Sequence, residues 1–184
     1  MLGQVSIVLG WALVLQGHSA TGLAQLRQGL ETLQNIGAKL PWPLVQLVDA
    51  YRHMRQPEEG LRVLDTLPGG LRVATADSQP QGQEEKQLST EIPSLLWLKG
   101  ELLLQLPRPE LQQAEQYFLQ ARELARRQRA RSDELRIVMS LCRLWQPHKS
   151  TAAHQMLTDV YRAFTEGHDT PDLMEAQALR QALG

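Results

Sequence analysis

Small and large apolar residues recur along this chain at spacings that are typical of paired helices. Two sets of five positions share offsets of 3, 12, 16 and 19 residues from their first member: Gly10, Leu13, Gly22, Leu26 and Gly29, and then Val48, Tyr51, Gly60, Leu64 and Leu67. Small residues suit positions where antiparallel helices approach closely, and apolar residues three or four apart fill the layer between the helices. The pattern therefore predicts a series of helical hairpins.

Turn residues divide the chain into the expected helices. Gly17 and Ser19 lie in the first turn, Pro41 opens the second hairpin, and Thr170-Pro171 begins a final helix. The hairpins are expected at about 3–16 with 20–36, 41–55 with 57–67, 92–105 with 110–128, and 132–145 with 150–164, followed by a helix at 172–182. We predict an all-α fold, a right-handed α-α superhelix of about four hairpins with a C-terminal capping helix.

One segment interrupts the pattern. Residues 71–89 are rich in Gln, Ser, Gly, Pro and charge and have no sustained apolar period, which predicts a loop or disordered link. The segment is either a hinge or a degraded hairpin helix, and the shortness of the preceding helix favours degradation. The expected organisation is thus 1–67 for hairpins 1 and 2, 68–90 for the polar loop or degraded helix, and 91–184 for hairpins 3 and 4 with the capping helix.

Composition and charge restrict the partners and the compartment. The net charge is −1, so no overall field attracts nucleic acid or an anionic membrane. The single cysteine, Cys142, lies in an apolar helical stretch and indicates a buried inert thiol in a reducing compartment. The apolar stretch 5–15 lacks a preceding Lys or Arg and is too short to span a bilayer. We therefore expect a cytoplasmic protein.

No pattern in the chain predicts catalysis, a cofactor or a metal. Of the five histidines, only His148 and His154 are near one another, and a separation of six residues does not place them on one helical face. Among the arginines of 121–131, Arg122, Arg126 and Arg129 share a face opposite the apolar stripe, and Glu123 can pair with Arg127. This favours a solvated surface over a phosphate-binding stripe. We expect no catalytic, cofactor-binding or metal-binding residue.

Four stretches carry a resemblance to a known group of proteins. They are LVDAYRHMRQPEEGLRVL (47–64), LKGELLLQL (98–106), AEQYFLQARELARRQRARSDELRIVMSLCRLWQ (114–146) and FTEGHDTPDLMEAQAL (164–179). They resemble the C-terminal tetratricopeptide-like repeat region of bacterial proteins in which an adenylate/guanylate cyclase domain or a DNA-binding regulator domain precedes an AAA/STAND-type ATPase. The hairpin spacing is itself similar to that of tetratricopeptide repeats.

The resemblance implies a non-catalytic protein-protein interaction or regulatory module, a detached C-terminal portion of a multidomain signalling protein. The alternative is a ligand-sensing regulatory arm of a class III nucleotide cyclase or AAA/STAND ATPase whose catalytic domain is not in this chain. No Walker motif G-x-x-x-x-G-K-[ST] is present, so no catalytic residue of those proteins is transferred.

A repeat stack without catalytic residues acts through its surface. The first helices of the hairpins are expected to line an inner groove that binds a protein or peptide segment, such as an upstream cyclase or ATPase domain. The candidate partner-binding residues are Tyr51, Arg52, Lys99 and Arg143. The four tryptophans fall at or near first helices and are expected to pack, with one or two of them lining the groove.

Overall fold

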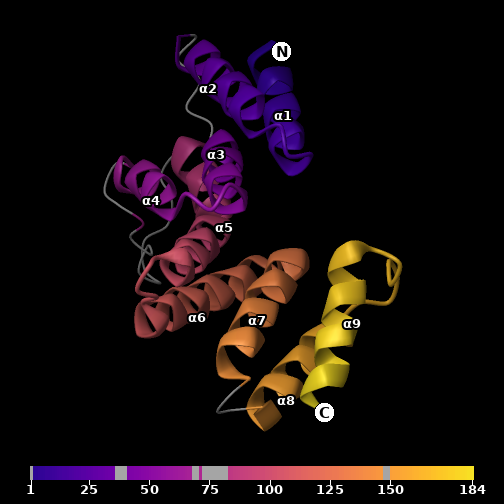
Figure 1. Ribbon diagram of the computed structural model, residues 1–184. Coiled ribbons are helices and arrows are strands. Elements are labelled where there is room, and N and C mark those ends of the chain that lie inside the picture. Colours follow the sequence, from indigo (N-terminus) through magenta and orange to yellow (C-terminus); the bar gives the residue numbers. More distant parts are fainter. Residues whose placement is uncertain (1, 36–40, 68–70, 72–82, 147–149) are drawn as a thin grey trace.

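The computed structural model describes residues 2–35, 41–67, 71, 83–146 and 150–184, and all regular structure in these ranges is α-helical. The helices are α1 (Leu2–Leu15), α2 (Ser19–Asn35), α3 (Trp42–His53), α4 (Pro57–Asp65), α5 (Gln83–Gln105), α6 (Leu111–Gln128), α7 (Arg131–Trp145), α8 (Ser150–Tyr161) and α9 (Pro171–Leu183) (Figure 1). The predicted all-α class is confirmed. None of these helices is both long and apolar enough to cross a lipid bilayer.

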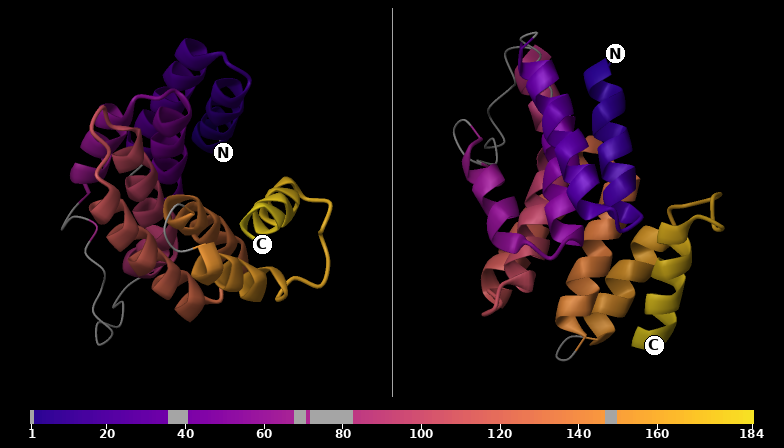
Figure 2. Two further views of the ribbon diagram at one scale, coloured as in Figure 1. Left: turned by 60° about the horizontal axis from the view of Figure 1, so that its bottom comes forward. Right: turned by 45° about the horizontal axis from the view of Figure 1, so that its top comes forward.

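The odd-numbered helices form a continuous row. Each helix packs on the next one in the chain, and in addition α1 contacts α3, α3 contacts α5, α5 contacts α7 and α7 contacts α9. Within the described residues, no even-numbered helix contacts another even-numbered helix. The even-numbered helices therefore fan apart, and the stack bends toward the odd-numbered row (Figure 2).

Glycines bring α1 and α2 unusually close together. A Cβ atom placed on Gly10 would lie 2.6 Å from the carbonyl oxygen of Gly22, and one placed on Gly29 would lie 2.6 Å from Cγ1 of Ile7. Ile7 and Leu26 are completely buried between these contacts. The small residues of the first hairpin thus occupy the helix crossing that their spacing predicts.

The third hairpin begins earlier than the sequence predicts. Helix α5 starts at Gln83 instead of near Ile92, and it continues through Pro93. The segment 83–89 therefore belongs to a helix although it lacks an apolar period, because Gln, Glu and Lys are good helix formers without help from a buried face. The rest of the predicted loop, residues 68–70 and 72–82, lies outside the described residues.

The core consists of four successive clusters, one for each step along the stack. The first joins α1, α2 and α3, the second joins α3, α4 and α5, the third joins α5, α6 and α7, and the fourth joins α7, α8 and α9. Each odd-numbered helix between the ends contributes to two clusters. In α3, for example, Tyr51 belongs to the first cluster and Val48 to the second.

Candidate binding groove

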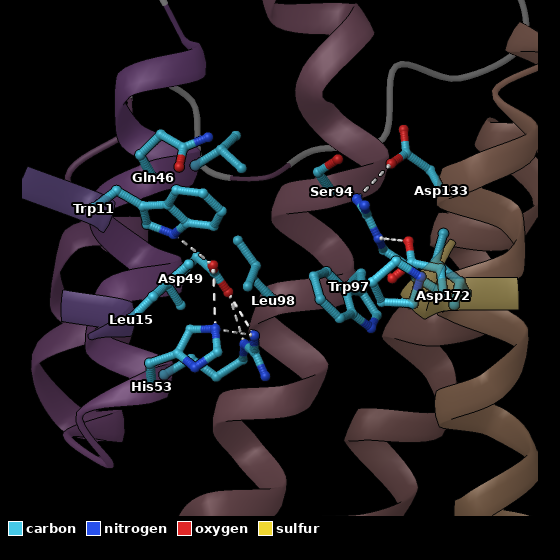
Figure 3. A pocket seen from close by; sticks show the side chains of 15 residues that line it. Trp11, Leu15, Gln46, Asp49, His53, Ser94, Trp97, Leu98, Asp133 and Asp172 are labelled. Atoms are coloured by element: carbon cyan, nitrogen blue, oxygen red, sulfur yellow. Dashed lines mark hydrogen bonds and ion pairs between the residues drawn. The ribbon is translucent and has the colours of Figure 1, made fainter. Parts of the chain in front are cut away.

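A groove with a cavity volume of about 740 Å³ runs along the odd-numbered helices (Figure 3). All of its lining residues in the described part of the chain come from α1, α3, α5, α7 and the start of α9. They are Trp11, Leu15, Val45, Gln46, Asp49, Arg52, His53, Ser94, Trp97, Leu98, Asp133, Arg136, Ile137, Pro171 and Asp172. The expectation that first helices of the hairpins line an inner groove agrees with this arrangement.

Asp49 organises the wall formed by α1 and α3. Its two carboxylate oxygens accept hydrogen bonds from Nε1 of Trp11 and from Nε of Arg52, each at 2.8 Å. The Arg52 guanidinium also lies over the Trp97 ring of α5, 5.3 Å from the ring centroid, which is within cation–π range. Three helices are thereby joined at this wall, and both tryptophan rings are held in place.

His53 stays neutral beside this network. Its Nε2 lies 2.8 Å from Nη2 of Arg52, which can only donate, so the imidazole nitrogen is the acceptor. Burial lowers the pKa of His53, the neighbouring Arg52 lowers it further, and Asp49 opposes the shift. At neutral pH this histidine adds no positive charge to the groove.

The opposite wall contains two carboxylates that share one arginine. Nε of Arg136 donates to Oδ2 of Asp172 at 2.8 Å, and its Nη1 lies 3.9 Å from Oδ1 of Asp133. Burial raises the pKa of Asp133, against the opposing effects of Arg136 and of a hydrogen bond with Ser94. The pKa of Glu91 is raised by burial and then by the negative charge of Asp133. Two carboxylates therefore face a single guanidinium at this end of the groove.

The middle of the groove combines a fixed aromatic ring with an unfilled acceptor. Nε1 of Trp97 donates to Oγ of the buried Ser140 at 2.9 Å, which ties α5 to α7. On the α3 side, Oε1 of Gln46 is buried and accepts no hydrogen bond within the described part of the molecule. This oxygen is inaccessible from the surface, so its unmet hydrogen bond is a local cost to the fold.

The four predicted partner-binding residues do not gather at the groove. Arg52 lines it, whereas Lys99 lies over the Tyr117 ring of α6 and Arg143 forms an ion pair with Glu175 of α9. The placement of Tyr51 on the groove surface is wrong, because its side chain is 3% exposed and its hydroxyl accepts a hydrogen bond from Arg27. The Tyr51 ring packs in the first core cluster, and its hydroxyl group is hydrogen-bonded inside the protein instead of facing the groove.

Sequence reasoning missed most of the charged residues that do line the groove. Asp172 reaches Arg136 only because α9 folds back on α7, and no local spacing shows this, whereas Asp133 and Arg136 are three residues apart on one helix. The spacing of Asp49 and Arg52, three apart on one helix, is a signal that was available. Trp11 and Trp97 are the two tryptophans that line the groove, whereas Trp42 and Trp145 pack elsewhere.

The described residues offer little for metal binding or thiol chemistry. They contain no group of three His, Cys, Asp or Glu side chains that could hold a metal ion. Cys142 is fully buried, its Sγ donates to the carbonyl oxygen of Ala153 at 3.2 Å, and burial raises its pKa to about 11. The prediction of a buried thiol is confirmed, and such a pKa leaves very little thiolate at neutral pH.

The groove is thus lined by two tryptophan rings, by apolar side chains and by charged groups from five helices. Comparison with protein-family models, with curated proteins and with solved structures found no match to this chain.

Proposed function

We propose that this protein is a non-catalytic interaction module that holds a segment of another protein in the groove of its odd-numbered helices. The observation that carries the proposal is that five successive odd-numbered helices contribute side chains to one channel. A surface assembled from so many repeats is well suited to follow a linear partner. The cavity volume of about 740 Å³ accommodates several side chains and is too small for a folded domain.

Preorganisation supports the same proposal. Trp11 and Trp97 each donate their indole N–H to a fixed partner, and Arg52 holds the Trp97 ring from one side. Rigid aromatic side chains contribute contact area on binding without losing much side-chain entropy. A partner that stacks on these rings therefore meets a surface that is already ordered.

The resemblance stated above extends the proposal to architecture and context. We infer a tetratricopeptide-like right-handed superhelix, in which α9 acts as the capping helix, and a regulatory role in bacterial signalling. The row of contacts along the odd-numbered helices supports such a superhelix.

One observation favours the alternative, a ligand-sensing arm of a class III cyclase or AAA/STAND ATPase that packs against its catalytic domain. Helix α1 has no charged residue, and Val5, Val8 and Leu9 are 63%, 56% and 49% exposed. Exposed apolar faces of this kind are typical of protein contacts. If this alternative holds, a cyclase domain joined to this chain should change its activity when a ligand binds. The Val8→Glu variant should abolish that change in activity.

Selection from a displayed library of random linear peptides tests the interaction function. Leu15→Gln changes a groove residue that is 45% exposed, and Leu119→Gln is the matched control, since Leu119 is 42% exposed on α6 and lies outside the groove. We expect selected peptides to lose affinity for Leu15→Gln and to bind Leu119→Gln unchanged. Peptides that bind both variants equally well, or turnover of ATP or GTP by the purified chain, would contradict the proposal.

A further inference from the structure

The groove has more negative than positive groups. In the described part of the chain its lining contains three carboxylates, Asp49, Asp133 and Asp172, but only two guanidinium groups, Arg52 and Arg136. His53 adds no charge, since its Nε2 faces the Arg52 guanidinium. The groove therefore has an excess of one negative charge even before Glu91, which interacts electrostatically with Asp133, is considered.

The excess is concentrated at the end formed by α5, α7 and α9. Arg52 is engaged by Asp49 at 2.8 Å at the other end, so it does not neutralise the second pair of carboxylates. Arg136 makes a close hydrogen bond to Asp172 but lies 3.9 Å from Asp133. One guanidinium thus serves two carboxylates, and Asp133, which also has a hydrogen bond with Ser94, is the one farther from it.

Hydrogen-bond acceptors are in excess as well. Besides the three carboxylates of the lining, the buried Oε1 of Gln46 has no donor within the described residues. Gln46 comes from α3 and Asp133 from α7, so the two acceptors belong to opposite walls of the same cavity. Carboxylates only accept hydrogen bonds, so the pair at the end formed by α5, α7 and α9 favours a ligand that donates hydrogen bonds and is positively charged.

We propose that the segment held in the groove is basic, and that a Lys or Arg side chain of this segment reaches the carboxylates of Asp133 and Asp172. Apolar or aromatic side chains of the same segment then contact Trp11, Leu15 and Trp97 toward the other wall. This proposal rests on the interaction function proposed above and adds the chemistry of the partner. It disfavours acidic segments, which would meet the excess of one negative charge.

Peptides selected from the displayed random library on the full chain provide the probe. We expect them to be enriched in Lys and Arg next to apolar residues, with affinity that falls as salt is raised. Fluorescence anisotropy of individual labelled peptides then measures the effect of neutralising single carboxylates. Asp172→Asn should weaken binding about tenfold, the size expected for a lost charged hydrogen bond.

Two further variants separate charge from loss of structure. Asp159→Asn is the matched control, because Asp159 is an exposed helical carboxylate with its own partner, Gln155, and lies outside the groove. It should leave affinity unchanged. Arg136→Gln should instead tighten binding of basic peptides, since it removes the cation that competes for both carboxylates. A destabilised groove would weaken binding in every case, so an increase cannot come from misfolding.

The outcomes distinguish this inference from the function on which it rests. Basic peptides that respond to Asp172→Asn and Arg136→Gln as described would support both. Peptides that lose affinity for Leu15→Gln but have no excess of Lys or Arg, or that ignore Asp172→Asn, would overturn the basic partner and leave the interaction function in place. If no selected peptide depends on Leu15, both proposals fail.

Discussion

The close approach of α1 and α2 gives a sharp test of the fold through one methyl group. Gly10→Ala adds a Cβ that would lie 2.6 Å from the carbonyl oxygen of Gly22 and 2.7 Å from the backbone nitrogen of Leu26. These are backbone atoms, so they cannot rotate away as a side chain can. The substitution therefore forces the two helices apart along part of their shared surface.

Two opposing terms determine the size of the effect. Alanine stabilises a helix interior by about 1 kcal/mol relative to glycine. Ordinary contact requires about 3.4 Å or more, so the helices must separate by several tenths of an ångström around the buried Ile7 and Leu26. Overpacking of this kind costs about 1–3 kcal/mol, and the gap that opens beside it forfeits part of the dispersion energy as well. We expect a net loss of about 1 kcal/mol, which lowers Tm by about 2–4 °C in a chain of this size.

Thermal and urea unfolding followed by circular dichroism measure the change. Ala24→Gly, at an exposed position in the interior of α2, calibrates helix propensity within the same hairpin and should cost about 1 kcal/mol. Gly22→Ala should lower stability by about as much as Gly10→Ala. The double variant should cost less than the sum of the two, because one separation of α1 from α2 makes room for both methyl groups. A rise in Tm for Gly10→Ala would mean that the higher helix propensity of alanine is the only effect, and that the backbones of α1 and α2 are not in contact.

Three other predictions concern the core and one titrating group. Ala121→Leu, at a fully buried position of α6, should cost about 1–3 kcal/mol by overpacking, and an unchanged Tm would contradict the α5–α6 packing. Ser140→Ala removes the acceptor of the Trp97 indole and should cost about 1–3 kcal/mol, with a shift in tryptophan emission that Thr158→Ala does not produce. The pKa of His53 is lowered in the folded protein, so the unfolded chain binds the extra proton first, and wild type should lose stability relative to His53→Gln as pH falls below about 6.5. Parallel pH profiles of the two proteins would exclude this role for His53.

The sequence predicts where helices lie and where small residues allow a close helix crossing better than it predicts which helices pack against each other. Gly10, Gly22 and Gly29 lie at their expected helix crossing, because a close approach of two backbones restricts which residues fit. Gly60 has the same spacing, yet a Cβ there would lie 2.7 Å from Leu102 of α5, nearer than any atom of its hairpin partner α3. Periodicity therefore identifies a small position without identifying the helix that approaches it.

The groove was harder to predict because it depends on contacts between distant segments. Arg136 and Asp172 are brought together by the return of α9 onto α7, and the one local pattern, Asp133 three residues before Arg136, does not point to Asp172. Tyr51 and Arg52 are adjacent, but only one of them lines the groove, since successive helical residues point in different directions. The contacts among the odd-numbered helices determine which side of each helix faces the groove. Those contacts depend on how all the hairpins stack, so one helix sequence does not reveal them.

The division of the core into four clusters affects how the protein unfolds. Each cluster adjoins only its neighbours in the row, so the ends of the stack are coupled only through the intervening layers. The groove, in contrast, takes residues from α1 and from α9 at once. A segment that fills it would connect the first and last layers directly and convert a graded, end-first loss of structure into a single cooperative transition. Ligand binding should then be visible as a steeper denaturation curve, in addition to a higher midpoint.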